Sequence, residues 1–133
     1  MRVTDWQIRL ADLVHRRHLQ GFAWGERDCV TWAADAVLAV TGRDPLADLR
    51  GQWHSHEEAR AAILRCGGLA RACSARLGPR IKPALAAAGD VGLLRDVGTR
   101  AVVVHVGACW MGQGEQGLVP IRAELVRWAW RAA

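Results

Sequence analysis

The sequence predicts an α+β domain in which N-terminal helices pack on a small antiparallel sheet. Segments with helical periodicity and capping residues come first, and short apolar runs separated by glycine-rich turns follow after Pro83. Helices that precede strands, rather than alternating with them, are typical of α+β domains. A length of 133 residues fits one domain, and we predict a single domain over residues 1–133.

Two helices are predicted before residue 42. The first runs from a cap at Thr4 or Asp5 to about His18. Its apolar face consists of Trp6, Ile8, Leu10, Leu13 and Val14. The second covers Cys29–Val40, after Asp28 as its N-cap, and ends at Gly42.

Two further helices and three strands are predicted after a polar connector. Ser55 and Glu58 have the spacing of a capping box, which opens a helix to about Arg65. A shorter helix covers Leu69–Leu77. The predicted strands are Asp90–Leu94, Ala101–Cys109 and Leu118–Ile121. The segment Arg122–Arg131 is predicted to be a short helix or a mixed segment.

The charge balance limits the classes of partner. The net charge is +5, and every basic residue except Lys82 is an arginine. This surface suits a polyanion such as cell-wall polymer, nucleic acid or a membrane face, although a coding bias toward arginine explains it equally well. We expect no nucleic-acid partner, because no basic run exceeds Arg16-Arg17. We expect no membrane insertion either, because the longest apolar run, Ala101–Met111, is too short and contains His105.

The cysteines predict free thiols rather than a metal site or a disulfide framework. They are Cys29, Cys66, Cys73 and Cys109. No CxxC pair occurs among them, and the histidines outside the apolar strand have no carboxylate or thiol at ligand spacing. Zinc held by the four cysteines is the alternative. We therefore expect neither a metal nor a cofactor, and a chain made in a reducing cytoplasm, since the N-terminus has no signal-peptide core.

Cys29 and His105 are the residues whose types and places predict chemistry. A helix N-terminus stabilises a thiolate through unpaired N–H groups and the helix dipole, and Cys29 is the first residue after the Asp28 cap. The charge of Asp28 opposes this effect. His105 lies in an otherwise apolar strand and is a candidate base. The alternative is that both are core residues without chemistry, a buried thiol and a buried imidazole.

Three segments, in this order, resemble the NlpC/P60 cell-wall peptidases. Phe22–Cys29, which reads FAWGERDC, resembles the nucleophile segment of that family. Gly89–Leu94 resembles its Gly-Asp step and following strand, and His105–Gly107 resembles the His-Val-Gly of its catalytic strand. With Thr41–Pro45, Arg50-Gly51 and a terminal Ala129–Arg131, the chain looks like the small versions carried by tailed bacteriophages and prophages.

The resemblance implies a papain-like fold and a phage tail-associated peptidoglycan hydrolase. It would cut amide bonds of the stem peptide, with Cys29 as nucleophile, His105 as base and the Cys29 backbone N–H as an oxyanion donor. The family usually has Ser after the cysteine, where this chain has Val30, and a polar residue after the histidine that orients the imidazole. Gln113, Glu115 and Gln116 lie in the corresponding region, and Gln113 is taken as the candidate for that third catalytic role.

Three residues near the predicted nucleophile are expected to bind the substrate. They are Trp24, Asp28 and Trp53. Their expected ligand is the stem peptide of peptidoglycan, and other tail-tip proteins are the expected protein partners. The resemblance places the chain in the virion tail, acting in the host periplasm or cell wall after synthesis in the bacterial cytoplasm.

Two other functions stay open. A catalytically silent NlpC/P60-fold protein of a tail tip or baseplate fits the missing third polar residue. A secreted antibacterial amidase fits the same fold and basic charge.

Overall fold

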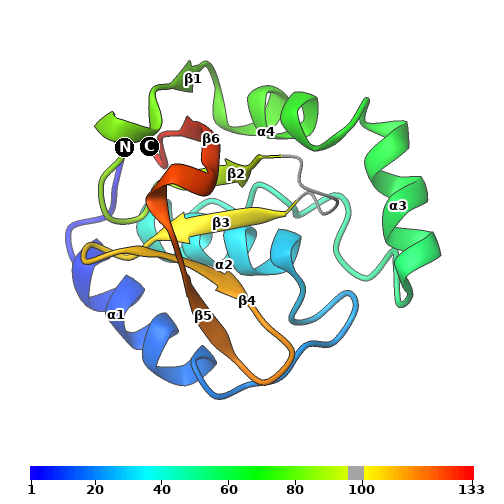
Figure 1. Cartoon of the computed structure of the whole chain (residues 1–133), viewed down its shortest axis with the longest axis horizontal. Coiled ribbons are helices and arrows are strands. Elements are labelled where there is room, and N and C mark those ends of the chain that lie inside the picture. Colours follow the sequence, from blue (N-terminus) through cyan, green and yellow to red (C-terminus); the bar gives the residue numbers. More distant parts are fainter. Residues whose placement is uncertain (96–100) are drawn as a thin grey trace.

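The computed structural model describes residues 1–95 and 101–133, and in them it has four α-helices and six strands (Figure 1). The helices are α1 (Trp6–Arg17), α2 (Cys29–Thr41), α3 (His56–Arg65) and α4 (Leu69–Leu77). The strands are β1 (Arg80–Ile81), β2 (Val91–Leu94), β3 (Val102–His105), β4 (Trp110–Gln113), β5 (Leu118–Ile121) and β6 (Val126–Trp130). Two 3-10 turns, η1 (Pro83–Leu85) and η2 (Ala123–Leu125), precede β2 and β6. The predicted α+β class is confirmed.

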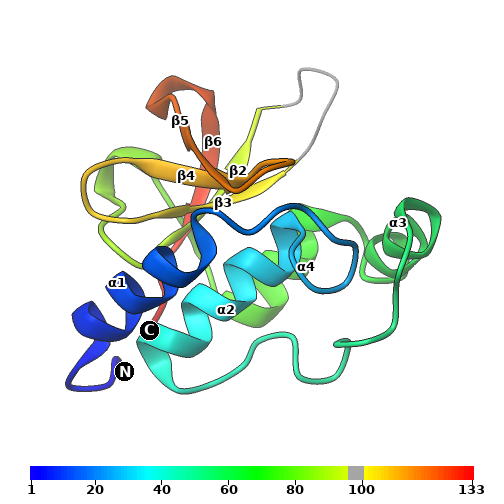
Figure 2. The ribbon, with the colours of Figure 1, turned by 90° about the horizontal axis from the view of Figure 1, so that it is seen from below.

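All strand pairs are antiparallel and form one sheet in the order β1-β6-β2-β3-β4-β5. The strand β6, which is the last in the sequence, therefore lies inside the sheet, between β1 and β2. Figure 2 shows the helices on one side of this sheet, with α2 beneath β3. Because side chains alternate along a strand, each strand sends half of its residues toward the helices and half away from them.

The hydrophobic core has a cluster on each face of the sheet and a third beside α3. The helix-facing cluster includes Trp32 of α2, Val104 of β3 and Trp130 of β6. The cluster on the opposite face consists of Val103, Trp110, Val126 and Ala129. The third joins α2 and α3 to the connector between them through Ala34, Leu46, Trp53, Ala59 and Ala62.

The predicted helix caps are confirmed with changes in detail. Asp28 forms a reciprocal capping box with Thr31, and the Ser55 side chain accepts from the Glu58 N–H. The Glu58 carboxylate, however, accepts from the backbone N–H of His54 rather than that of Ser55. Asp5 is at the N-cap of α1, but its side chain makes no capping bond and pairs with Arg9 instead.

The predicted strand Ala101–Cys109 is too long. The strand β3 ends at His105, and a turn closed by the Val106 N–H to the Cys109 carbonyl, 2.8 Å, leads into β4. Gly107, with a φ of 106°, adopts the left-handed backbone conformation that reverses the chain. The prediction ran through this turn because Gly107 is a single glycine inside an otherwise apolar run, which a strand also tolerates.

Of the two alternatives predicted for Arg122–Arg131, the short helix is wrong and the mixed segment is closer, because the residues form η2 and the strand β6. Val126 is β-branched and Trp128 is aromatic, and both residue types are common in strands. Arg127 between them is exposed, as alternation along a strand predicts. Pairing of β6 with both β1 and β2 supplies the hydrogen bonds that a short helix would have made internally. No helix in the described part of the chain is long and apolar enough to cross a membrane.

Candidate functional site

Asp28 organises the N-terminal end of α2. The residue is 2% exposed, and its two carboxylate oxygens accept three hydrogen bonds. Oδ1 accepts from the Thr31 N–H at 2.8 Å. Oδ2 accepts from the Gly25 N–H at 2.8 Å and from the Trp53 indole Nε1 at 2.8 Å. The carboxylate thus joins the loop before α2 to the connector that follows it, and it faces the interior of the protein.

Cys29 follows as the first helical residue, at the predicted position. It packs against the helix-facing core cluster, as Cys73 of α4 also does. The pKa of the Cys29 thiol is raised to about 11, chiefly by burial and also by the charge of Asp28. The backbone N–H groups of Val102, Cys29 and Val30 oppose this and lower the pKa, but burial has the larger effect. The thiol is therefore neutral near pH 7, whereas a nucleophile needs the thiolate.

His105 is the last residue of β3 and pairs with Trp110 of β4. The two rings meet edge to face with their centroids 5.0 Å apart. The Gly107 N–H donates to His105 Nδ1 at 3.1 Å, which places the proton of the neutral ring on Nε2. Burial lowers the pKa of His105, and the charge of Asp90 partly offsets this.

The sheet separates His105 from Cys29. Val102 and Val104 belong to the helix-facing cluster, and Val103 belongs to the cluster on the opposite face. Side-chain alternation places His105 on the same face as Val103, and its contact with Trp110 agrees with this. The backbone N–H near the Cys29 thiol is that of Val102, three residues or roughly 10 Å along the strand from His105. The structure does not bring these two side chains together.

Gln113, the predicted third catalytic residue, lies on the helix-facing side of β4. Its Oε1 accepts from Arg17 Nε at 3.3 Å, and its Nε2 donates to the Gln20 carbonyl at 3.0 Å. Nε2 also donates to the carbonyl of Gly114 at 2.9 Å. Gln113 thus fastens the end of α1 to the β4–β5 hairpin and does not reach His105, which lies on the other face of the sheet.

The two predicted tryptophans differ in exposure. Trp53 is 3% exposed and is held by Asp28, so its ring belongs to the interior. Trp24 is half-buried, and its ring meets those of Phe22 and His56 edge to face, with centroids 4.7 and 5.5 Å away. Of the expected substrate-binding residues, Trp24 therefore has the most contact with solvent.

A buried arginine near α2 was missed by the sequence prediction. Arg17 is 4% exposed and forms an ion pair with Asp35 of α2. It also donates to Thr31 Oγ1 at 3.2 Å and to the Glu26 carbonyl at 3.3 Å. Its burial could have been predicted from the spacing in the sequence, because Arg17 follows Leu13 by four residues on the buried face of α1. These bonds lock α1, the loop before α2 and β4 around the α2 N-terminus.

Comparison with known proteins yields one match. A family model described as a domain of unknown function (DUF6950) matches residues 1–132. No curated protein and no solved structure matches significantly.

Proposed function

The chain belongs to the DUF6950 family, and we propose that it is a catalytically silent, papain-like structural domain of a phage tail tip. The resemblance described above supports the papain-like fold and the tail location. Its partners are then neighbouring tail-tip proteins, and its location is the virion tail.

The observation that carries the proposal is the separation of the two residues that would have to react together. General-base activation of a thiol requires the base within hydrogen-bond reach of the sulfur, about 2.6–3.2 Å or one water further. Here the imidazole lies on the face of the sheet opposite the helices, while the thiol is half-buried and packs against the helix-facing core. A thiol with its pKa raised to about 11, and with no base beside it among residues 1–95 and 101–133, is a packing residue.

The sequence departures agree with this proposal. Val30 stands where the related peptidases usually have Ser, and it lines an apolar pocket rather than a polar cleft. Gln113 is the candidate to orient the base, but its side-chain amide already forms hydrogen bonds with Arg17 and with two backbone carbonyls. The residues that correspond to catalytic machinery therefore have structural contacts in this chain.

The second candidate is the peptidoglycan hydrolase that cuts stem-peptide bonds through Cys29. One feature favours it, since the N–H groups of Cys29 and Val30 at the start of α2 lower the thiol pKa. A secreted antibacterial amidase would depend on the same feature. Both candidates require turnover, which the structural role does not.

Release of soluble muropeptides from purified peptidoglycan tests the proposal. We expect the wild-type protein, Cys29→Ala and His105→Ala all to give the background release of buffer alone. A second arm asks whether the chain remains with tail particles through a density gradient, as a structural component does. Release by the wild type that Cys29→Ala abolishes would overturn the proposal and support the hydrolase.

A further inference from the structure

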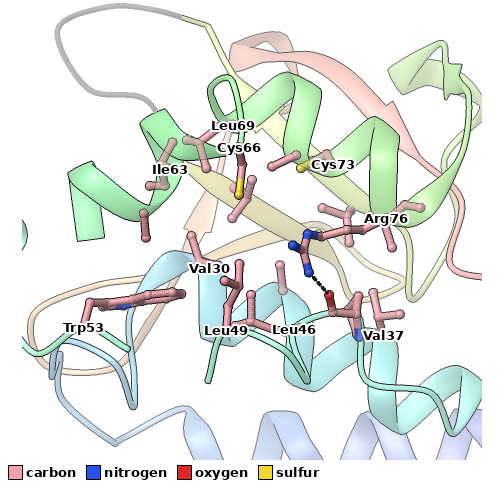
Figure 3. A pocket seen from close by; sticks show the side chains of 18 residues that line it. Val30, Val37, Leu46, Leu49, Trp53, Ile63, Cys66, Leu69, Cys73 and Arg76 are labelled. Atoms are coloured by element: carbon pink, nitrogen blue, oxygen red, sulfur yellow. Dashed lines mark hydrogen bonds between the residues drawn. The ribbon is translucent and has the colours of Figure 1, made fainter. Parts of the chain in front are cut away.

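An apolar pocket lies between α2, α4 and the connector that follows α2 (Figure 3). Its walls are formed mainly by alanine, valine and leucine side chains, and its volume is about 80 Å³. Cys66 and Cys73 contribute their sulfur atoms to one wall. Trp53 and Arg76 lie at opposite ends of the pocket (Figure 3). Among the described lining residues, Arg76 is the one that carries a charge.

The walls cannot satisfy a polar ligand. The indole N–H of Trp53 is already donated to Asp28, which removes it from the pocket. Burial raises the pKa of the Cys73 thiol to about 12, so this thiol stays neutral and is at most a weak donor. A peptide segment inside would leave its backbone N–H and C=O groups without hydrogen-bond partners, which is unfavourable for each buried group. The buried part of a ligand must therefore be hydrocarbon.

Arg76 supplies a cationic end to this hydrocarbon channel. Its Nη1 donates to the Pro45 carbonyl at 2.8 Å and to Asp48 Oδ1 at 2.6 Å, and Nη2 donates to Asp48 Oδ2 at 3.1 Å. A guanidinium has five N–H donors, and these three bonds together with the contact to the Cys66 side chain leave at least one donor for an anion. The Asp48 side chain is 65% exposed and lies on the outer side of the pair, where water can solvate it.

We propose that this pocket binds the alkyl chain of a fatty carboxylate, with the head group on Arg76 and the tail directed toward Trp53. The hydrocarbon walls select an alkyl chain, and the arginine at one end selects an anionic head group over a neutral or cationic one. The site is separate from Cys29 and His105, so the inference goes beyond the structural role proposed above and does not depend on it.

Sodium decanoate, kept below its micelle concentration, is the probe that tests this binding. Titrated into isotopically labelled wild-type protein, it should give saturable NMR shifts at the Trp53 indole and the Ala72 methyl. Ala72→Leu fills the pocket and should weaken binding by at least about tenfold. Ala75→Leu adds the same volume on the exposed side of α4 and should leave binding unchanged.

The head group is tested with a second matched pair. Arg76→Gln should weaken decanoate binding by about tenfold and leave 1-decanol binding unchanged, because only the carboxylate uses the guanidinium. Arg71→Gln, exposed on the same helix, should change neither ligand. Vesicles of phosphatidylglycerol distinguish the source of the chain. Binding of decanoate but not of the vesicles supports a free fatty carboxylate, whereas vesicle binding that Ala72→Leu removes would point to a membrane lipid and count against the proposal.

Three results would overturn the proposal. They are the absence of saturable shifts in the wild type, shifts that map away from Trp53 and Ala72, and equal decanoate affinity in Ala72→Leu and Ala75→Leu. Saturation of the pocket by an apolar side chain of a partner protein, with no response to decanoate, would also count against it. The wild-type titration keeps the test valid even where a variant fails to fold.

Discussion

Asp28 has a larger structural role than capping a helix. Its carboxylate is the common acceptor for the Thr31 and Gly25 backbone and for the Trp53 indole. Three segments of the chain therefore depend on one buried side chain. This explains why an acidic residue stands directly before Cys29, where its charge raises the thiol pKa.

Replacing Asp28 should therefore be costly. Asp28→Ala leaves three N–H donors without their acceptor and should lower the free energy of unfolding by about 3 kcal/mol. Urea unfolding followed by far-UV circular dichroism measures this. Asp5→Ala is the matched control, because Asp5 is also an N-cap aspartate but makes no capping bond, and its loss should cost about 0.5 kcal/mol or less. Equal costs for the two variants would contradict this role of Asp28.

His105 predicts a dependence of stability on pH. Burial lowers its pKa in the folded protein below the value of about 6.5 for a free imidazole. As the pH falls below that value, the unfolded chain takes up the proton first. The contribution of His105 to stability is therefore present above about pH 6.5 and is lost as the pH falls through its folded pKa.

An NMR titration of the His105 ring measures this directly, with the urea-unfolded chain as reference. The folded midpoint should lie below the unfolded one. The stability of His105→Gln should vary less with pH than that of the wild type between about pH 5 and 7. A folded midpoint above the unfolded one would instead indicate an anionic partner that stabilises the imidazolium.

At the scale of elements, Arg17 joins α1 to α2. Its guanidinium contacts Asp35, Thr31 and Gln113, and it lies 5.7 Å from the centre of the Trp32 ring. Burial lowers the pKa of Arg17, while the charge and hydrogen bond of Asp35 raise it. This balance is typical of a buried ion pair, in which the loss of one partner leaves the other unsatisfied.

Arg17→Met should lower the free energy of unfolding by about 3 kcal/mol. The neighbouring Arg16→Met is its control, because Arg16 pairs with Asp12 on the exposed face of α1 and should contribute about 0.5 kcal/mol or less. Guanidinium chloride unfolding of the two variants provides the comparison. A smaller cost for Arg17→Met than for Arg16→Met would show that the buried pair does not hold α1 in place.

The elements differ in how far the sequence predicts them. Helix boundaries at Asp28 and Ser55 were predictable because capping is a local interaction between neighbouring residues. The face occupied by His105 was not, because Val102–Val104 are buried on both sides of the sheet. A strand buried on both faces has no polar alternation, so its sequence does not reveal which face meets the helices.

For the same reason the candidate pair could be named but not placed. The residue types of Cys29 and His105 and their local settings were visible in the sequence, whereas their separation depends on strand register. The strand β6 shows the same dependence, since its pairing with β1 and β2 is a long-range interaction. The pocket at Arg76 is formed by segments whose packing no local pattern specifies.

At the scale of the whole molecule, Asp90 fastens both ends of the chain. Its carboxylate is fully buried and accepts from Arg2 Nη2 at 2.9 Å, the Ala132 N–H at 3.0 Å and the Ala87 N–H at 3.0 Å. Arg2 adds a bond from Nε to the Ala132 carbonyl at 3.0 Å. Figure 1 shows the two ends side by side. The Gly-Asp step that resembles a peptidase motif thus has a structural function in this fold.

Hydrogen exchange tests this role of Asp90. The Ala132 amide should exchange slowly in the wild type, because its hydrogen bond lies in the interior. Asp90→Ala should speed that exchange by at least about tenfold and lower the free energy of unfolding by about 2–4 kcal/mol. Exchange of Ala132 at the same rate in both proteins would show that the chain end is held by other contacts.

The rate of Cys29 alkylation as a function of pH tests the central claim, that this chain has no activated nucleophile, most directly. Peptide mass spectrometry resolves Cys29 from the other thiols. Their alkylation in the same sample is the internal control for the activity of the reagent. A silent site predicts a rate that rises only toward the thiol pKa of about 11, with the same profile in His105→Ala. A plateau with a midpoint well below about 8.5, shifted by His105→Ala, would contradict it and identify a reactive pair.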